Sequence, residues 1–565
     1  MSWFIGFRNI DNNKDMGKIH SKSNVLHSGQ IGEFYFQAGG IPETCRYLEI
    51  AKKKMLVLGL PINNDSLNIV NKEELLLCLQ NMNFSQLTGA YTLIIFANSK
   101  IKIIGDKLNL RKIYYYQQRE DFILSTEIFW IKSIMKLKPA LDSLGIYWNL
   151  GHAHGDNGLF GNVKTITGDY SLEVDSQFRL TKQEVKRNKH LPEYDAKAKE
   201  KIKEKLSHFI YNLKNTKLSL SLSGGLDSRT ILAYLMQNNN HFISHTFGEA
   251  GNYDVIIAKQ LAKKFNFANI NYDNFKQIDK YSFVEDIQEF IRETEMTQSL
   301  VSFPLYDYFK DLKPRVNLII DGGFVCYLRR VTNNKIIMFN RQSFINNDVP
   351  KIYSLLKLAK ADVFLDDIQT ELDSQAQQHL NSILAKYKIS PKTDIGDWLD
   401  LIKFRLMNSY YFAPSQRRYD EFIPNLMVGA QGFFTDLVFS IPPKERKDYK
   451  INREIIKSIS PKLMNMPYAR YNTYVKSLTT ANFDFVKAKI NQKLGHTYNR
   501  SDSHFYLGML EEWLNDKAKS VSVTNSNLLD HKKIKTLLSK YYHRKDLGQA
   551  NNIMKMVQII SFLDE

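Results

Sequence analysis

Residues 216–228 read TKLSLSLSGGLDS, and this stretch decides the fold of the second half of the chain. The alternating leucines at 218–222 predict a strand that ends at Gly224-Gly225. The segment RTILAYLMQN at 229–238 then predicts a helix. A strand, a glycine-rich turn and a helix in this order place the turn at the N-terminus of the helix. Unpaired N–H groups and a positive partial charge lie there, so the turn suits an anion.

The same alternation of strands and helices continues beyond this turn. HTF at 245–247, ANINY at 268–272 and VNLIID at 316–321 predict strands. DVIIAKQLAKKF at 254–265 predicts a helix between two of them. Strands that alternate with helices imply a parallel sheet with right-handed crossovers. Ligands bind at the carboxyl ends of the strands in such sheets.

The first part of the chain, up to about residue 175, reads as β-rich. Short runs of β-branched and aromatic residues predict strands at 1–7, 54–62, 90–97, 100–106, 112–118 and 121–126. Asn98-Ser99 and residues 119–121 predict two hairpin turns, and the segments 72–82 and 127–135 are helical by period. We therefore predict an N-terminal domain over residues 1–190 and an α/β domain with a helical extension over 195–565.

Composition limits the class of protein. The chain has 565 residues, of which 43% are hydrophobic, enough to bury large cores and to exclude global disorder. No window of about 18 uncharged apolar residues predicts a membrane span. Three scattered cysteines and the absence of a signal-like N-terminus favour the cytoplasm. The net charge of +18 favours polyanions in general, including nucleic acid and phosphorylated small molecules, without choosing among them.

The turn at 223–228 carries its own chemistry. Ser223 and Ser228 add hydroxyl donors to the backbone amides. Asp227 would repel a bare phosphate, so its presence fits a Mg²⁺ ion between the carboxylate and the phosphate. A Walker loop is excluded because it needs GxxxxGK followed by Ser or Thr.

SGGLDS resembles the pyrophosphate-binding loop of the N-type ATP pyrophosphatases, which cleave ATP to AMP and pyrophosphate. Together with the β-rich segment before it, the chain resembles the asparagine synthetase family, which includes β-lactam synthetases and lasso-peptide cyclases. The segments 89–128, 158–174 and 251–265 are similar to that family in the same order. The resemblance implies an N-terminal Ntn-hydrolase-like αββα sandwich, followed by a doubly wound parallel-sheet ATP pyrophosphatase domain with a helical extension.

The resemblance also implies an activity and a set of site residues. We expect a ligase that adenylates a small-molecule or peptide carboxylate with ATP and Mg²⁺ and joins it to an amine. A nucleic-acid partner is not expected, and a homodimer stays open. The residues implied to bind nucleotide are Ser223, Gly224, Gly225, Leu226, Asp227, Ser228, Thr246, Phe247, Gly248 and Gly322. From their own chemistry, Asp321, Arg329 and Arg330 are the candidate catalytic residues, since the two arginines would stabilise negative charge on the phosphates. Asp227 and Asp321 are the candidate metal ligands.

Two departures from the family pattern stand out. Glutamine-dependent members need Cys as residue 2, but this chain has Ser2, and Thr88 stands where an aspartate would bind the glutamine ammonium. We therefore expect an inactive glutaminase domain and ammonia, or another free amine, as the nitrogen source. The third loop lacks the usual carboxylates after its glycines, since residues 321–330 read DGGFVCYLRR.

Other interpretations remain open. The missing carboxylates favour a pseudoenzyme that binds nucleotide without chemistry, whereas the net charge favours a tRNA-modifying ATP pyrophosphatase. A standard glutamine-dependent enzyme is disfavoured by Ser2. Arg417-Arg418 fits a solvated or salt-bridged face better than a substrate clamp. His152 and His154 have HxH spacing but no third ligand, so we expect no metal there.

Overall fold

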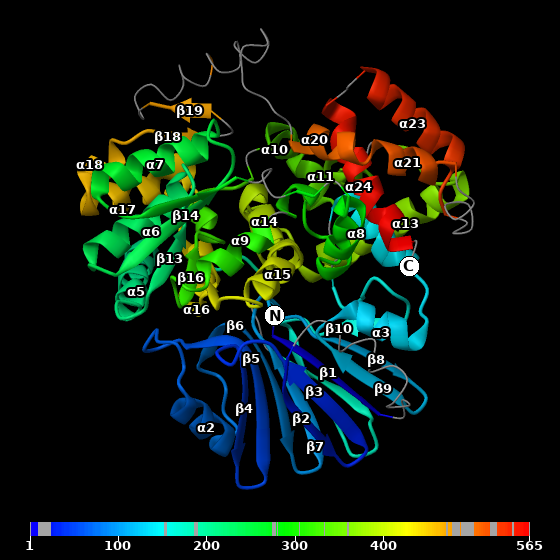
Figure 1. Ribbon diagram of the computed structural model, residues 1–565, viewed down its shortest axis with the longest axis horizontal. Helices are drawn as coiled ribbons and strands as arrows, with labels where there is room; N and C mark the ends of the chain where they lie inside the picture. Colours follow the sequence, from blue (N-terminus) through cyan, green and yellow to red (C-terminus); the bar gives the residue numbers. More distant parts are fainter. Residues whose placement is uncertain are drawn as a thin grey trace.

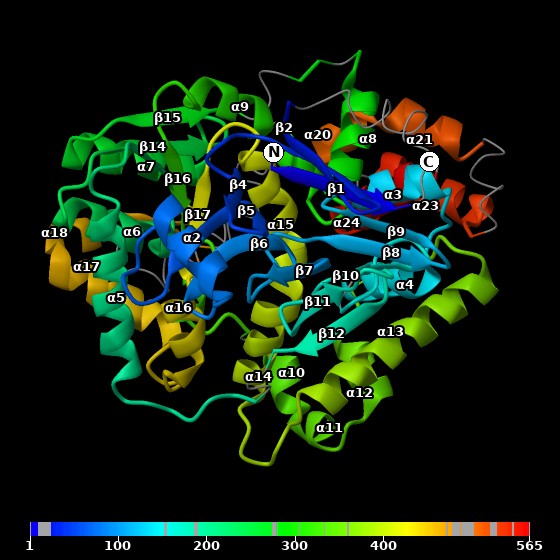
Figure 2. The same ribbon diagram turned by 90° about the horizontal axis from the view of Figure 1, so that it is seen from below.

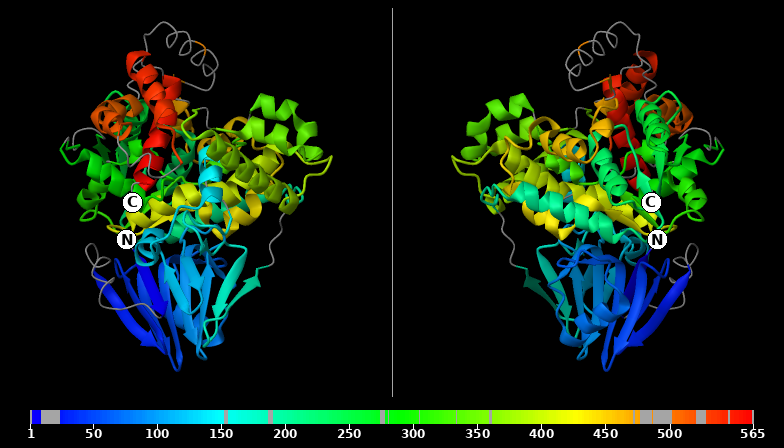
Figure 3. Two further views of the ribbon diagram at one scale, coloured as in Figure 1. Left: turned by 90° about the vertical axis from the view of Figure 1, so that its right-hand side faces the viewer. Right: turned by 90° about the vertical axis from the view of Figure 1, so that its left-hand side faces the viewer.

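A computed structural model describes most of the chain. The described residues are 2–8, 24–151, 155–185, 190–273, 278–279, 281–303, 305–332, 334–358, 361–470, 473–476, 486, 502–519, 528–544 and 547–563. Residues 152–154, with the two histidines of the HxH pattern, lie outside this set. Figure 3 shows antiparallel sheets at one end of the molecule and helical layers at the other.

The first part of the chain folds into two six-stranded antiparallel sheets (Figure 1). The first has the order β10-β8-β9-β1-β3-β2, and the second has the order β12-β11-β7-β6-β5-β4. The strands are β1 (Trp3–Arg8), β2 (Val25–Ile31), β3 (Phe34–Gly39), β4 (Cys45–Ile50), β5 (Lys53–Asn63), β6 (Leu87–Ala97), β7 (Lys100–Gly105), β8 (Tyr114–Gln118), β9 (Asp121–Ser125), β10 (Val163–Thr165), β11 (Tyr170–Val174) and β12 (Leu180–Glu184).

Both predicted hairpins are present. Ala97 pairs with Lys100 across Asn98-Ser99, and both turn residues have positive φ, at 52° and 57°. Two positive φ values are what a type I′ hairpin turn requires, because its twist matches that of the strands. Gln118 pairs with Asp121 in the second hairpin.

The two antiparallel sheets enclose one core and carry helices on their outer faces. Aromatic side chains such as Phe36, Phe96 and Phe122 fill the space between the sheets. Helix α2 (Lys72–Asn81) covers the second sheet, whereas α3 (Ile128–Met135) and α4 (Leu141–Leu150) cover the first. The layers therefore run α, β, β, α, and this predicted sandwich is confirmed.

The second part of the chain is built on a five-stranded parallel sheet of order β15-β14-β13-β16-β17. Its strands are β13 (Leu218–Ser221), β14 (Phe242–Phe247), β15 (Asn269–Tyr272), β16 (Leu318–Asp321) and β17 (Asn425–Met427). Leu220 and Ile320 share a core with helix α6 on one face, whereas Ile319 packs with Phe290 and Phe309 on the other. Helices on both faces make the sheet doubly wound, as predicted.

Helices make up most of the remainder. They are α5 (Ala198–Asn212), α6 (Leu226–Gln237), α7 (Tyr253–Phe265), α8 (Phe283–Glu293), α9 (Leu305–Leu312), α10 (Lys335–Phe339), α11 (Arg341–Ile345), α12 (Val349–Leu356), α13 (Asp366–Lys386), α14 (Ile395–Ile402), α15 (Asn408–Tyr419), α16 (Gly432–Leu437), α17 (Lys450–Ile459), α18 (Pro461–Met464), α20 (Asp502–Met509), α21 (Glu511–Lys517), α23 (His531–Arg544) and α24 (Leu547–Leu563). A π-helix spans Lys403–Met407, and a hairpin joins β18 (Tyr468–Arg470) to β19 (Thr473–Val475). Within the described residues, no helix combines the length and apolarity needed to cross a bilayer.

The two parts of the chain share hydrophobic cores. Ile5 of the first sheet belongs to the same buried cluster as Ile553 of the C-terminal helix α24. Helix α13 lies against α4, so it borders the sandwich (Figure 2). The packing is therefore continuous across the predicted boundary near residue 190, and the division of the chain at that point stays a prediction.

Candidate functional site

The loops that follow β13 and β16 meet at one edge of the parallel sheet. Residues 223–228, here called the phosphate loop, connect β13 to α6. Residues 321–330, here called the third loop, follow β16, which is the neighbour of β13 in the sheet. Parallel neighbours end at the same edge, so the topology brings these two segments together as predicted.

The phosphate loop is held in shape by its two serines. The Ser223 amide donates to Ser228 Oγ at 3.1 Å, the two hydroxyl oxygens are also 3.1 Å apart, and the Gly225 amide donates to Ser223 Oγ at 3.2 Å. Gly225 caps α6 without any side-chain hydrogen bond to the first turn. The first N–H groups of α6 therefore have no side-chain cap, which suits them to an anionic ligand.

The third loop lies directly against this helix N-terminus. A Cβ added to Gly322 would sit 3.3 Å from the backbone nitrogen of Ser228. Glycine at this position keeps the N–H of Ser228 open to a ligand. The missing Cβ leaves a cradle beside the amides, and this fits a phosphate group of ATP.

Two partly buried carboxylates border the cradle. Burial raises the pKa of Asp227 to about 6, against the opposing effects of the Arg329 guanidinium and the Asn452 amide. Burial also raises the pKa of Asp321 to about 6, although the Gly323 amide and the side chain of Gln416 favour its charged form. A nearby cation would stabilise both charged forms.

The same carboxylates are the candidate Mg²⁺ ligands. Asp227 Oδ2 lies 4.0 Å from Arg329 Nε, and its other oxygen accepts from Asn452 at 3.3 Å. Asp321 accepts from the Gly323 amide at 2.6 Å. Among the described residues, no group of three or more His, Cys, Asp or Glu side chains is arranged for a metal. Two carboxylates still fit Mg²⁺, which takes the rest of its ligands from phosphate and water.

The two arginines of the third loop point to different places. Arg329 faces Asp227 and so belongs to the site. Arg330 instead forms an ion pair with Asp394 at the N-terminus of α14, and its side chain also fills the space beside Gly396. The structure therefore does not bring Arg330 together with the phosphate loop, and its catalytic role stays a prediction.

Thr246, Phe247 and Gly248, which are predicted to bind nucleotide, lie at the end of β14. The Thr246 hydroxyl is buried and donates to the Leu222 carbonyl at 2.8 Å, so it supports the phosphate loop from behind. Phe247 stacks on Tyr272 with ring centroids 5.9 Å apart. Gly248 has a φ of +134°, which favours glycine there. Their contact with a nucleotide stays a prediction.

Sequence reasoning missed three side chains around the phosphate loop. Asp254, in the first turn of α7, accepts from the Gly224 amide at 2.7 Å. Asn452 of α17 reaches Asp227 from a distant part of the chain. Arg229 is fully buried behind the loop. Arg229 and Asp254 stand next to motif positions, but their partners are set by tertiary packing, which no local pattern reveals.

Arg417 and Arg418 are salt-bridged, but they lie in the interior. Arg417 pairs with Glu127 at 3.2 Å and Glu295 at 3.4 Å, and Arg418 pairs with Glu293 at 3.0 Å. The arginine side chains are 6% and 9% exposed, so the alternative of a solvated face is wrong. These pairs join the antiparallel sandwich to α8 and α15.

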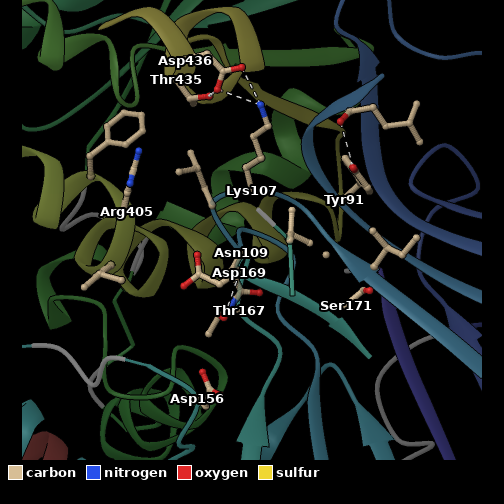
Figure 4. Close-up of a pocket in the computed structure, with 18 of the residues that line it drawn as sticks. Tyr91, Lys107, Asn109, Asp156, Thr167, Asp169, Ser171, Arg405, Thr435 and Asp436 are labelled. Atoms are coloured by element: carbon tan, nitrogen blue, oxygen red, sulfur yellow. Dashed lines mark hydrogen bonds and ion pairs between the residues drawn. The ribbon is translucent and has the colours of Figure 1, made fainter. Parts of the chain in front are cut away.

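A cavity of the described part of the chain lies elsewhere, between the second antiparallel sheet and the helices (Figure 4). Its volume is about 670 Å³, and its lining includes Tyr91 of β6, Arg405 of the π-helix and Asp436 of α16. Lys107 pairs with Asp436 at 2.8 Å across its wall. No residue of the phosphate loop or the third loop lines it, so it is separate from the candidate nucleotide site.

A sandwich of antiparallel sheets joined to a doubly wound parallel sheet with a glycine-rich phosphate loop defines a class of α/β proteins with a site at the sheet edge. Comparison with protein families shows what part of the chain is similar to. Residues 213–388, which include the phosphate loop and the third loop, match the asparagine synthase family. This match agrees with the resemblance to the asparagine synthetase family that the sequence shows.

The chain is also similar to individual known proteins. The chain is 24% identical over 260 residues to a Methanocaldococcus jannaschii protein named "Putative asparagine synthetase (glutamine-hydrolyzing) 2", covering 42% of this chain. The match spans about half, 48%, of that relative's length. The structure of the allosteric regulatory enzyme of purine biosynthesis matches with a TM-score of 0.24 and 8% identity, covering 48% of this chain and 80% of the other. Glutamine phosphoribosylpyrophosphate amidotransferase from B. subtilis matches with a TM-score of 0.22 and 7% identity, covering 48% and 65%. At these TM-scores neither structure supports an argument about this chain.

Proposed function

We propose that this protein is an ATP-dependent, AMP-forming ligase that joins a carboxylate to an amine as an amide. One observation carries the proposal: the open helix N-terminus of α6 meets Gly322, and this leaves room for a phosphate at the Ser228 amide. The family match over residues 213–388 supports the same class of reaction.

The proposed reaction has two steps, adenylation of the carboxylate and transfer of the acyl group to the amine. A carboxylate oxygen of the substrate attacks the α-phosphorus of ATP, and the bond from this phosphorus to the bridging oxygen breaks, so that pyrophosphate leaves. The nitrogen of the amine then attacks the activated carbonyl carbon, AMP leaves with the former carboxylate oxygen, and a proton is lost to solvent. The first step is needed because a free carboxylate is a poor acyl donor.

The phosphate loop would stabilise the leaving pyrophosphate. Charge builds on that group as its bond to the α-phosphorus breaks, so N–H donors aimed at it gain most in the transition state. The hydroxyl groups of Ser223 and Ser228 lie on the same side as the Gly225 amide. Arg329 stands beside Asp227 and would neutralise further charge. A Mg²⁺ ion held by Asp227 and Asp321 would supply charge neutralisation to the phosphates.

We further propose ammonia, or an amine carried by the substrate, as the nitrogen source. Ser2 is only 3% exposed and its hydroxyl is hydrogen-bonded to that of Thr44. A serine hydroxyl is also a weaker nucleophile than a thiolate. Thr88 is buried and carries no charge that could bind the ammonium of glutamine.

A second candidate is a nucleotide-binding protein without catalysis. Asp321 is the only acidic residue among 321–330, and both its oxygens have protein donors, Gly323 at 2.6 Å and Gln416 at 3.5 Å. These contacts would compete with a metal ion.

Pyrophosphate exchange separates the two candidates. The protein is incubated with ATP, Mg²⁺, labelled pyrophosphate and the small-molecule fraction of a cell extract. A ligase returns label to ATP only when a carboxylate substrate is present, because adenylation is reversible. Binding of ATP without any exchange in any fraction would favour the second candidate.

A further inference from the structure

Arg229 stands out because it is a cation with a relative exposure of 0%. It lies in the first turns of α6, directly after the phosphate loop. Among the described residues, it forms no ion pair with a carboxylate, and its Nε has no hydrogen-bond partner. Burial lowers the pKa of Arg229 to about 10, so the guanidinium stays charged at neutral pH. A buried charge of this kind is costly unless polar groups compensate it.

The compensation comes from backbone carbonyls on two segments. Nη1 donates to Met466 at 3.0 Å and to Leu463 at 3.5 Å, and Nη2 donates to Pro467 at 2.5 Å. Nη2 also donates to the Gly224 carbonyl of the phosphate loop at 3.4 Å. The guanidinium therefore joins the loop to residues 463–470, which with 473–475 are here called the strap and include the end of α18 and the strands β18 and β19.

The strap also contacts the loop directly. The amide of Ala469 in β18 donates to the same Gly224 carbonyl at 2.9 Å. A Cβ on Gly224 would meet the Cβ of Ala469 at 3.0 Å, so the two chains are in close contact. The β18 part of the strap lies beside α7 (Figure 1).

These contacts determine the orientation of one peptide group. In a trans peptide the C=O and the following N–H point in opposite directions. The Gly224 carbonyl points to Arg229 and Ala469, so the Gly225 N–H points the other way, and it indeed donates to Ser223 Oγ. That is the side of the serine hydroxyls, where a phosphate would bind.

We propose that Arg229 is a positioning residue that holds the strap on the carbonyl side of the Gly224–Gly225 peptide and thereby aims the loop amides at the pyrophosphate end of ATP. The inference rests on the proposed function, since it deepens the role of the same loop. Glycine flanks both sides of this peptide, so no Cβ limits its rotation, and within the loop it is held by the hydrogen bond from the Gly225 N–H to Ser223 Oγ. The four carbonyl contacts of Arg229 add an external anchor.

Titration calorimetry with inorganic pyrophosphate and with AMP tests the proposal on the full-length protein. Arg229→Gln should weaken pyrophosphate binding by about tenfold and leave AMP binding within about twofold, because AMP has no phosphate at the loop amides. Arg229→Lys keeps the charge without the forked donor geometry, so it should recover part of the loss. An equal loss for both ligands would show general damage and would overturn the proposal, as would unchanged pyrophosphate binding.

A second variant leaves the buried charge in place. Ala469→Pro removes the amide that donates to Gly224 without changing the guanidinium, so it should weaken pyrophosphate binding by about threefold and spare AMP. This variant keeps the proposal open to refutation if Arg229→Gln does not fold. Pyrophosphate binding as tight as that of the wild type would then contradict the role of the strap.

Hydrogen exchange separates failure of this inference from failure of the proposed function. If the wild type binds neither ATP nor pyrophosphate, the proposed function fails. The anchor is then tested by amide exchange in residues 463–470, which Arg229→Gln should accelerate by about tenfold. Amide exchange at the wild-type rate in Arg229→Gln would show that Arg229 does not hold the strap in place.

Discussion

Asp227 Oδ2 lies 4.0 Å from Arg329 Nε, so the phosphate loop and the third loop meet through a carboxylate and a guanidinium. The pair is partly buried, with side-chain exposures of 26% for the aspartate and 21% for the arginine. A divalent cation would bind the carboxylate, and the phosphates bound to that cation would bind the guanidinium. The pair thus occupies the place where the reacting end of ATP is proposed to bind.

Asp227→Ala should weaken Mg²⁺-dependent ATP binding by about tenfold or more, because it removes one of the two candidate metal ligands. Calorimetry at matched Mg²⁺ measures the change. Asp367→Ala on the exposed first turn of α13 is the control and should bind ATP like the wild type. Equal affinity in Asp227→Ala and wild type would exclude Asp227 as a metal ligand.

Gly322→Ala should weaken pyrophosphate binding by about tenfold with little change in thermal stability. The new methyl group would stand 3.3 Å from the Ser228 nitrogen and would obstruct an oxygen that accepts from it. Gly508→Ala is the matched control, since a Cβ there meets no atom within 4 Å. Titration of both variants with pyrophosphate measures this change. Wild-type affinity in Gly322→Ala would show that the phosphate does not bind at the Ser228 amide.

Glu127 should make stability depend on pH. Burial raises its pKa from 4.5 to about 8, although the Arg417 guanidinium opposes the shift. Between these pH values the folded protein keeps a proton that the unfolded chain has released, so stability falls as the pH rises. The free energy of unfolding of the wild type should therefore fall by about 1–3 kcal/mol more than that of Glu127→Gln between pH 5 and pH 8.5.

Urea unfolding at both pH values measures this difference. Glu43→Gln, at an exposed turn, is the control and should follow the wild type. A Glu127→Gln variant whose stability changes with pH as much as that of the wild type would show that Glu127 is ionised throughout.

The wild-type protein should release glutamate from glutamine only at the background rate, because Ser2 is buried against Thr44. A coupled glutamate assay measures this, with Ser2→Ala as the matched variant. Glutamate release that disappears in Ser2→Ala would show that the serine is a working nucleophile and that glutamine is a nitrogen source.

Local patterns explain which features were predictable. The strand, turn and helix around Gly224-Gly225 follow from residues close together in the chain, as do the turns at Asn98-Ser99 and after Gln118. The alternation of strands with helices then predicted a parallel sheet, in which the strands before the phosphate loop and the third loop end at the same edge.

Long-range partners explain what could not be predicted. Arg330 shares the sequence signature of Arg329, and only packing against α14 directs it to Asp394. Three of the four carbonyl partners of Arg229 lie in residues 463–467. The carboxylate partners of Arg417, Glu127 and Glu295, lie just after β9 and just after α8. Such contacts depend on how whole layers pack, which neither periodicity nor spacing encodes.

The product of ATP breakdown tests the central claim most directly. Labelled ATP is incubated with the protein, Mg²⁺ and the small-molecule fraction of a cell extract, and AMP is separated from ADP. Attack at the α-phosphorus predicts AMP and pyrophosphate in equal amounts, formed only with a substrate fraction and lost in Asp227→Ala. ADP and inorganic phosphate as the sole products would contradict the adenylation mechanism.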